Sequence, residues 1–229
     1  MSSINQQGEK RSFKQNLSIF LSNNRTALIV IVALIVLSLA GTAVYTVVHQ
    51  DRLEKSSLLA EELQGLLEDW RDSEEDAEKS ELSQEIEKKA KEAIDSYPKM
   101  FAAQRAYLVL GQLAFEKEAW DEALENYGKL ADNFGQSYLA PIALMNAAVS
   151  SERMNDHQRA ISLYQRVVDN YSDTFPDASY ALLSIGRLYE KMDNSGAAID
   201  AYNEIIDTFS ESNWTNIAHN RIIYLETVN

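Results

Sequence analysis

The sequence feature that most constrains the fold is a spacing of small and aromatic residues that occurs three times. In each instance a small residue is followed twelve positions later by an alanine and sixteen positions later by a tyrosine. An alanine lies five positions before each instance, at Ala106, Ala143 and Ala181, and Ala218 begins a fourth unit, so the units recur every thirty-seven or thirty-eight positions. A fixed period of this length is typical of helical repeat arrays. The instances are Gly111/Ala123/Tyr127, Ala148/Ala160/Tyr164 and Gly186/Ala198/Tyr202.

The spacing has a physical explanation in close helix packing. Two antiparallel helices approach tightly only where their facing residues are small, and the interlocking side chains then fix the crossing angle. We therefore expect Gly111 to face Ala123 within one helix pair, with Tyr127 filling the space beside them. The other two instances predict the same contact in the next two pairs.

These residues resemble the tetratricopeptide repeat (TPR) family, whose small, alanine and aromatic positions they match. The family's period of about 34 residues is shorter, so we place the extra length of this chain in turns around residues 135–139 and 172–177. The resemblance covers roughly residues 58–229. It implies an all-α solenoid of about four helix pairs and a closing helix near 214–228, and it implies nothing about chemistry.

Residues 26–48 predict a single transmembrane helix. They contain no charged residue, and 23 residues at about 1.5 Å each span the roughly 30 Å hydrocarbon core. The alternative is a cleaved signal peptide, but the apolar run is longer than the 7–15 residues typical of a signal core.

The flanks of this helix predict its orientation. Residues 1–25 contain four Lys/Arg and one Glu, whereas the charges just after the helix are balanced. The positive-inside rule places this basic tail in the cytoplasm and the repeats across the membrane, which is the periplasm in a bacterium with two membranes. The apolar residues at positions 13, 17, 20 and 21 predict either a short amphipathic helix on the membrane surface or a disordered tail.

Residues 49–81 are predicted to form a membrane-proximal helix and an acidic linker or acid-rich helix start, before a repeat domain at 82–229. Leucines and a tryptophan between 58 and 70 predict the first helix of a degenerate repeat that starts near residue 58. Its second helix is predicted at Leu82–Tyr97, before Pro98. A degenerate first repeat is expected because a terminal repeat has only one neighbour.

The order of basic tail, membrane helix, degenerate repeat and regular repeats is similar to that of the ancillary Sec translocon subunit family. This resemblance implies a role in protein export and the Sec translocon as a partner. TPR lipoproteins of outer-membrane assembly have comparable repeats, but a chain without cysteine has no residue for their lipid anchor.

The sequence predicts no enzyme, cofactor site or metal site. His49, His157 and His219 lie far apart and accompany no motif of a metalloenzyme, hydrolase or nucleotide-binding protein. The net charge of −14 disfavours nucleic-acid binding. We expect protein partners and no small-molecule substrate.

In TPR arrays the first helix of each pair lines a concave groove that holds an extended peptide or a partner helix. The resemblance carries these groove positions to Arg105, Leu108, Gln112, Phe115, Met145, Val149, Tyr180, Leu183, Arg187, Asn220 and Tyr224. Groove positions that hold asparagine in TPRs that grip a C-terminal carboxylate are occupied here by Leu108, Met145 and Leu183. They predict an apolar groove, with burial of the three side chains as the alternative.

The sequence therefore predicts a non-catalytic, membrane-anchored scaffold for protein–protein interaction. Its expected role is that of an accessory or chaperone-like factor in protein export or envelope assembly. The alternative is a structural tether that links a membrane complex to one folded, soluble partner.

Overall fold

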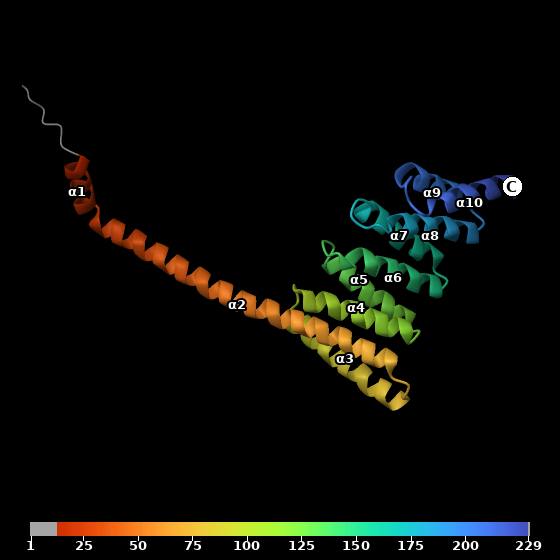
Figure 1. The fold of residues 1–229 in the computed structure, drawn as a ribbon, viewed down its shortest axis with the longest axis horizontal. Coiled ribbons are helices and arrows are strands. Elements are labelled where there is room, and N and C mark those ends of the chain that lie inside the picture. The colour runs from red at the N-terminus through yellow and green to blue at the C-terminus, as the bar shows by residue number, and fades with distance from the viewer. Residues whose placement is uncertain (1–12, 229) are drawn as a thin grey trace, which may run out of the picture. The chain divides into compact units, whose positions relative to one another are not determined.

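The computed structural model describes residues 13–228 and is all-helical over that range, with ten helices and no strand (Figure 1). This confirms the predicted all-α fold. The helices are α1 (Phe13–Asn23), α2 (Arg25–Asp72), α3 (Asp76–Ser96), α4 (Phe101–Glu116), α5 (Trp120–Asn133), α6 (Leu139–Arg153), α7 (His157–Tyr171), α8 (Ala178–Lys191), α9 (Ser195–Thr208) and α10 (Thr215–Val228).

The chain divides into two compact units, with the boundary after Leu53. The first unit contains α1 and the first part of α2, which is long and apolar enough to cross a membrane by length and composition. The most apolar window of α2 has a mean hydropathy of 2.8, and none of that window is buried. The sequence predicted either a short helix or a disordered tail before the apolar segment. Residues 13–23 form a helix, and residues 1–12 lie outside the described part of the chain.

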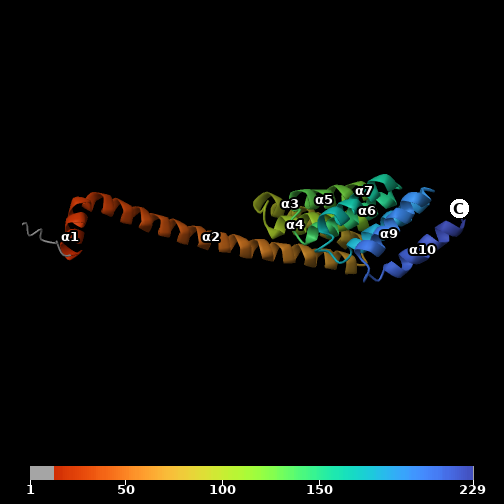
Figure 2. The same ribbon diagram turned by 90° about the horizontal axis from the view of Figure 1, so that it is seen from above.

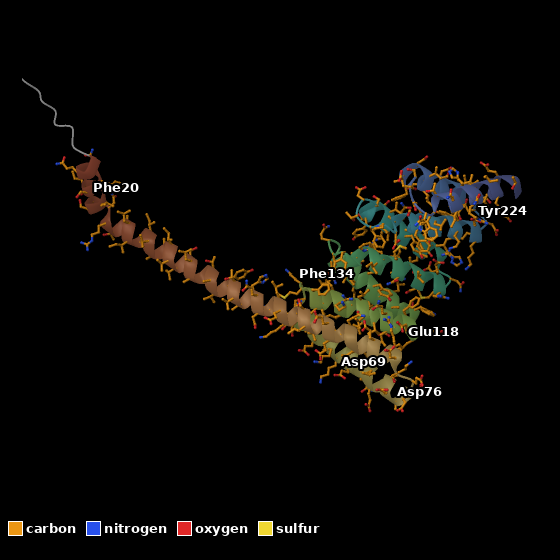
Figure 3. The ribbon with its side chains drawn as sticks, viewed as in Figure 1. Phe20, Asp69, Asp76, Glu118, Phe134 and Tyr224 are labelled. Atoms are coloured by element: carbon orange, nitrogen blue, oxygen red, sulfur yellow. The ribbon has the colours of Figure 1, made fainter. Side chains whose placement is uncertain are left out.

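The second unit, from Glu54 onward, is the repeat unit, and it begins with the last part of α2 and with α3. The two helices are separated by residues 73–75, in the acidic stretch (Figure 3, where Asp69 and Asp76 flank the break). Helix α3 therefore begins at Asp76, six residues before the predicted start. Asp76 and Glu78 lie in its first turn, where negative charge favours a helix N-terminus.

The helices of the repeat unit pack in chain order, each from α3 onward against the next, and α4 also packs against α6. Figure 2 shows α3, α5 and α7 along one side of the array and α4 and α6 along the other. The first pair is formed by α2 and α3, where Lys89 Nζ lies 2.7 Å from Glu62 Oε1. The later pairs are α4/α5, α6/α7 and α8/α9, and α10 follows them.

Two clusters of buried side chains form the core of the repeat unit. One joins α2, α3 and α4, and the other runs from α4 to α10. All buried members of both clusters lie between Leu59 and Leu225. The repeat unit therefore contains its own hydrophobic core.

The turns inside the pairs repeat with the same period. Glu118, Asn155 and Asp193 have φ values of 58°, 59° and 56°, and each is followed by the residue that precedes the next helix. The N–H of that following residue donates to the carbonyl five residues earlier, over 2.8–2.9 Å. This left-handed residue with a backward hydrogen bond is a common way to end a helix.

The connections between the later pairs are longer, at residues 134–138, 172–177 and 209–214. The first two include the segments where the sequence predicted the extra length of the period. In the first and last connections a serine organises the turn: the Ser137 and Ser212 N–H groups donate to Phe134 and Phe209 over 2.8 Å. The hydroxyls of these serines then accept from the backbone two residues later.

Candidate protein-binding surface

The predicted groove residues lie on helices α4, α6, α8 and α10, and on each helix their spacing places them on one side. We call this surface the first-helix face. Its positions repeat with the period of the array and form three rows across it. The rows are Arg105/Ile142/Tyr180/Ile217, Leu108/Met145/Leu183/Asn220 and Gln112/Val149/Arg187/Tyr224, with Phe115 at the end of α4.

The accessible side chains of the first-helix face are concentrated on α8 and α10. Tyr180 is 38% exposed, Tyr224 is 50% exposed, and Arg187 and Asn220 are also exposed. The Tyr180 ring lies 5.0 Å from the ring of Trp214, between centroids. The predicted residues on α4 and α6 are buried or half-buried, so the C-terminal part of the face offers the most area to a partner.

Leu108 belongs to the core and not to the surface. Its side chain is only 4% exposed and is a member of the α4–α10 cluster. Met145 and Leu183 are half-buried and pack against the same cluster. Leu108 is therefore buried, as the alternative prediction had it. Of the three side chains predicted to form an apolar groove, only Met145 and Leu183 have exposed edges that a partner could contact.

Both arginines of the predicted groove have partners within the array. Arg105 Nη1 donates to Gln64 Oε1 over 3.2 Å, and its guanidinium lies 5.3 Å from the centroid of the Phe101 ring. Arg187 Nη2 donates to both carboxylate oxygens of Glu152, over 2.7 and 2.8 Å. The positive charges on this face are therefore partly offset before any partner binds.

Two of the small residues predicted to mark close packing, Gly111 and Gly186, lie directly beneath tyrosine rings. A Cβ atom added to Gly111 would lie 2.5 Å from Cε1 of Tyr127, and one added to Gly186 would lie 2.3 Å from Cε1 of Tyr202. All nine residues of the three instances are buried. The α4/α5 and α8/α9 pairs therefore have a close contact at the predicted small residue, and the tyrosine makes it.

The alanines of the three instances are also buried in the core. Ala123, Ala160 and Ala198 are 0% exposed members of the α4–α10 cluster. They lie in the first turns of α5, α7 and α9, where each N–H donates over 3.0–3.1 Å to the carbonyl of the residue before the helix. The three atoms nearest to a Cβ on Gly111 or Gly186 all belong to tyrosine rings. In these two pairs the tyrosine, one helical turn after the alanine, makes the closest contact with the glycine position. Contact between the glycine and the alanine stays a prediction.

This geometry agrees with the comparison of the sequence with known protein families. The family model for tetratricopeptide repeat-like domains matches residues 19–227. The chain belongs to the tetratricopeptide repeat-like domain family. Such TPR-like domains generally mediate protein–protein interaction and are typically non-catalytic. A search of curated proteins found no match.

A polar set that the sequence analysis missed accompanies the tyrosines of the TPR-like pairs. Tyr164 Oη donates to Glu152 Oε1 over 2.8 Å, and Glu152 also accepts from Arg187 on α8. Tyr202 Oη likewise donates to Glu190 over 2.5 Å, and Glu190 accepts from Arg221 on α10. We call these the Tyr–Glu–Arg sets. Each connects one helix pair to the next.

A related arrangement occurs at the first regular pair. There Arg71 Nε donates to Glu116 Oε1 over 2.7 Å, and the negative charge of Glu116 acts on Tyr127. The arginine in this case comes from α2, the first helix of the preceding pair, and not from the first helix of the following pair. Glu152 and Glu190 are separated by one period of the array, so a search for repeated charged residues would have detected them.

The environment of the Tyr–Glu–Arg sets changes the pKa of their members. Burial, followed by the hydrogen bond and charge of the neighbouring glutamate, raises the pKa of Tyr164 and Tyr202. Burial opposes ionisation of Glu190, but the hydrogen bonds from Arg221 and Tyr202 outweigh it and lower the pKa of that carboxyl. At neutral pH the set on α8–α10 therefore contains a charged Glu190–Arg221 pair and a neutral Tyr202, which suits a structural role.

A hollow of about 860 Å³ borders the first-helix face at the start of α6, where Ile142 lines it. The connections at 135–138 and 174–175, the C-terminal ends of α5 and α7, and Pro141 and Ile142 at the start of α6 line it. None of the eleven predicted groove residues lines it. Arg166 in its wall pairs with Asp132 over 2.6 Å. The charges in this hollow are thus balanced within the array.

The histidines lie on three different helices: His49 on α2, His157 on α7 and His219 on α10. Over residues 13–228 no group of three or more histidine, aspartate or glutamate side chains is arranged to hold a metal ion. The arrangement of side chains on this TPR-like array is suited to contact with another protein.

Proposed function

We propose that this chain is a non-catalytic, membrane-anchored scaffold that binds proteins, as an accessory or chaperone-like factor in protein export or envelope assembly. The observation that carries the proposal is the exposed aromatic and polar surface of α8 and α10, around Tyr180 and Tyr224, on a TPR-like array. Aromatic side chains are the common anchors of protein interfaces. The family's general role in protein–protein interaction supports the proposal.

The proposed anchor is the apolar part of α2, residues 26–48, with the repeat unit on the extracytoplasmic side of the inner membrane. Confining the array beside a membrane complex would raise the effective concentration of weak contacts. The order of segments, which is similar to that of the ancillary Sec translocon subunit family, supports the Sec translocon as the partner complex.

The alternative function is a structural tether for one folded partner. The concentration of accessible side chains on α8 and α10 favours it, because a short patch suits a folded surface better than a long unfolded chain. A tether would bind one partner at fixed stoichiometry and would ignore unfolded chains.

Binding assays on residues 51–229 test both functions. A scaffold for unfolded clients binds many extended peptides weakly and slows the aggregation of a denatured protein, whereas a tether does neither. The double variant Tyr180→Ser/Tyr224→Ser should lose at least tenfold in affinity for either kind of partner with unchanged helicity. The matched control is Tyr138→Ser, because Tyr138 is 65% exposed and lies on neither α8 nor α10. Equal binding by the double variant and the control would contradict the proposed site.

The anchor is tested by extraction of membranes at alkaline pH and by the mass of the purified chain. An uncleaved chain that stays with the membrane supports the anchor, and replacement of 26–48 by a polar linker should release it. A shortened, soluble chain would establish the signal peptide instead.

A further inference from the structure

A second hollow, of about 410 Å³, lies beside Tyr180 where the chain enters α8. Asp177 and Ser179, at the start of α8, form one side of it, and residues 208–214, at the end of α9 and in the connection that follows, form the other. The ring of Trp214, which lines this hollow, lies 5.0 Å from the ring of Tyr180, between centroids. The hollow therefore adjoins the aromatic surface of α8 and α10 on which the proposed function rests, and we call it the Trp214 hollow.

Hydrogen bonds hold the walls of the Trp214 hollow in place. Ser212 Oγ donates to Ser179 Oγ over 2.9 Å and so joins the two sides. The N–H of Trp214 donates to Ser212 Oγ over 3.2 Å. The carbonyl of Phe209 accepts from the Ser212 N–H over 2.8 Å and from the Thr215 hydroxyl over 3.0 Å. The hollow is thus formed before a partner binds, which lowers the cost of binding.

The side chains that line the Trp214 hollow combine aromatic rings with carboxylates. Phe209 and Trp214 line it and are half-buried. Its charged lining residues are Asp177 and Glu211, both exposed, and neither lysine nor arginine of the described chain lines it. The face of an aromatic ring attracts a cation, and a carboxylate forms charged hydrogen bonds with lysine or arginine. The chemistry of the hollow therefore favours a positively charged side chain.

The 860 Å³ hollow is the counterpart of the Trp214 hollow one period earlier in the array. Tyr171 lines the earlier hollow and Phe209 lines the later one, and each directly ends or follows the second helix of its pair. In the earlier hollow the array supplies a cation itself, since Arg166 on α7 pairs with Asp132 over 2.6 Å. The register places Glu204 on α9 where α7 has Arg166, so α9 supplies no cation to the Trp214 hollow.

The basic residues of α8 and α10 do not supply this cation either. Arg187 pairs with Glu152, Arg221 pairs with Glu190, and Lys191 lies in the last turn of α8, at the end opposite the hollow. Residues 172–216 contain eight Asp/Glu and two Lys/Arg, so a partner with positive charge is favoured. A second copy of this chain is disfavoured, because residues 51–229 contain 17 Lys/Arg and 34 Asp/Glu, a net charge of −17.

We propose that the Trp214 hollow binds a lysine or arginine side chain of the protein partner, which therefore presents a basic segment to α8 and α10. The cationic group lies against the ring of Trp214, within reach of the carboxylates of Asp177 and Glu211. The inference rests on the proposed function in that the chain binds a protein at α8 and α10, and it adds the chemistry by which that partner is recognised.

Two small probes test this inference: N-acetyl-arginine amide and N-acetyl-citrulline amide, which has nearly the same shape and no charge. Each is titrated into isotope-labelled residues 51–229, and the NMR signals of the Trp214 indole N–H and the Ser212 amide report on the hollow. The arginine probe should shift both signals until they saturate, and added salt should weaken its binding. The citrulline probe should bind about fivefold more weakly or less, because it makes neither the cation–π contact nor the ion pair.

Two double variants with the same change in net charge locate the site. Asp177→Asn/Glu211→Gln removes the carboxylates of the hollow and should weaken binding of the arginine probe about fivefold. Asp173→Asn/Asp207→Asn removes two exposed carboxylates that do not line it, and should bind the probe as the wild type does. The side chain of Asp177 makes no capping hydrogen bond to α8, so both variants should stay folded, which circular dichroism checks.

The opposite results would overturn the inference. These are equal binding of the arginine and citrulline probes, equal binding by the two double variants, or no shift of the Trp214 signal. Failure of the inference and failure of the proposed function are distinguishable. A protein captured at Tyr180 equally by the wild type and by Asp177→Asn/Glu211→Gln would refute the basic segment and leave the proposed function intact. Binding of the arginine probe at Trp214 with no protein captured at Tyr180 would leave a cation-binding hollow and contradict the proposed function.

Discussion

The substitution Gly186→Ala tests the packing that defines the repeat. A Cβ atom at this position would lie 2.3 Å from Cε1 of Tyr202, whereas ordinary contact begins at 3.4 Å, so the shortfall is 3.4 − 2.3 = 1.1 Å. The ring cannot easily move away. It is 1% exposed, and its hydroxyl donates to Glu190, which is paired with Arg221. The helices α8 and α9 must therefore separate, or the polar set must break.

The expected cost follows from two opposing effects. Overpacking a well-packed core costs about 1–3 kcal/mol, and the alanine gains about 1 kcal/mol of helix propensity over glycine. Because the ring of Tyr202 is fixed at both ends, we expect the upper part of the first range. The free energy of unfolding should then fall by about 2 kcal/mol once the gain in propensity is subtracted.

The matched control is Gly128→Ala in α5. A Cβ atom at Gly128 would have nothing within 4 Å, so this variant should be more stable than the wild type by about 0.5–1 kcal/mol. Urea unfolding of residues 51–229, followed by far-UV circular dichroism, measures both changes, and an unchanged denaturant slope shows that the comparison is valid. Adding Tyr202→Leu should relieve the destabilisation in Gly186→Ala.

A stabilising Gly186→Ala variant would refute this reasoning. Ala148 occupies the equivalent position beside Tyr164 in the α6/α7 pair, so that pair provides a geometry that accepts a methyl group. Stabilisation would mean that α8 and α9 reach the same geometry at little cost, and that the repeat does not require glycine at this contact.

Three further outcomes are expected. Glu118→Gly should stabilise the repeat unit by about 0.5–1 kcal/mol, because a residue at φ 58° is strained unless it is glycine; a lower unfolding midpoint would contradict this. Hydrogen bonds from Arg221 lower the pKa of Glu190 against the opposing effect of burial. The contribution of ionised Glu190 to the free energy of unfolding is therefore present above the ordinary pKa of 4.5 and is lost as the pH falls through the lower pKa of the folded state. The difference in unfolding midpoint between wild type and Glu190→Gln should therefore shrink below about pH 4.5, and a constant difference would argue against the pair. Leu108→Asp should destabilise the repeat unit by roughly 3 kcal/mol, because it places a carboxylate in the core. Tyr180→Asp should change the free energy of unfolding by about 0.5 kcal/mol or less. Equal effects of the two substitutions would show that Leu108 lies on the surface.

Much of the fold could be predicted because the packing of each pair depends on a few side chains at fixed spacing. Gly111 and Tyr127 are sixteen residues apart, and this spacing recurs wherever two helices meet in the same way. The start of α3 was harder to predict. Asp76 and Glu78 belong to a charged stretch that suits a helix N-terminus as well as a solvated linker, and only packing against α2 distinguishes the two.

The surface was predicted less well than the core. Leu108 and Tyr180 both lie on first helices at groove positions, but Leu108 is buried by neighbouring helices that are distant in the sequence. Arg187 looked available for a partner, yet Glu152 from the preceding pair occupies it. Such contacts between pairs depend on how the pairs stack in the array. The spacing of residues within one repeat predicts contacts inside a pair and does not predict these.

The most direct test of the account is site-specific photocrosslinking in intact membranes, read by mass spectrometry. A photoreactive residue at Tyr180 reports on the first-helix face, and one at Asn203, which is exposed on α9, reports on a second helix. We predict that the probe at position 180 captures a protein partner and that the probe at position 203 does not. Equal capture from both positions, or capture from position 203 alone, would contradict the claim that this TPR-like array binds proteins through its first helices.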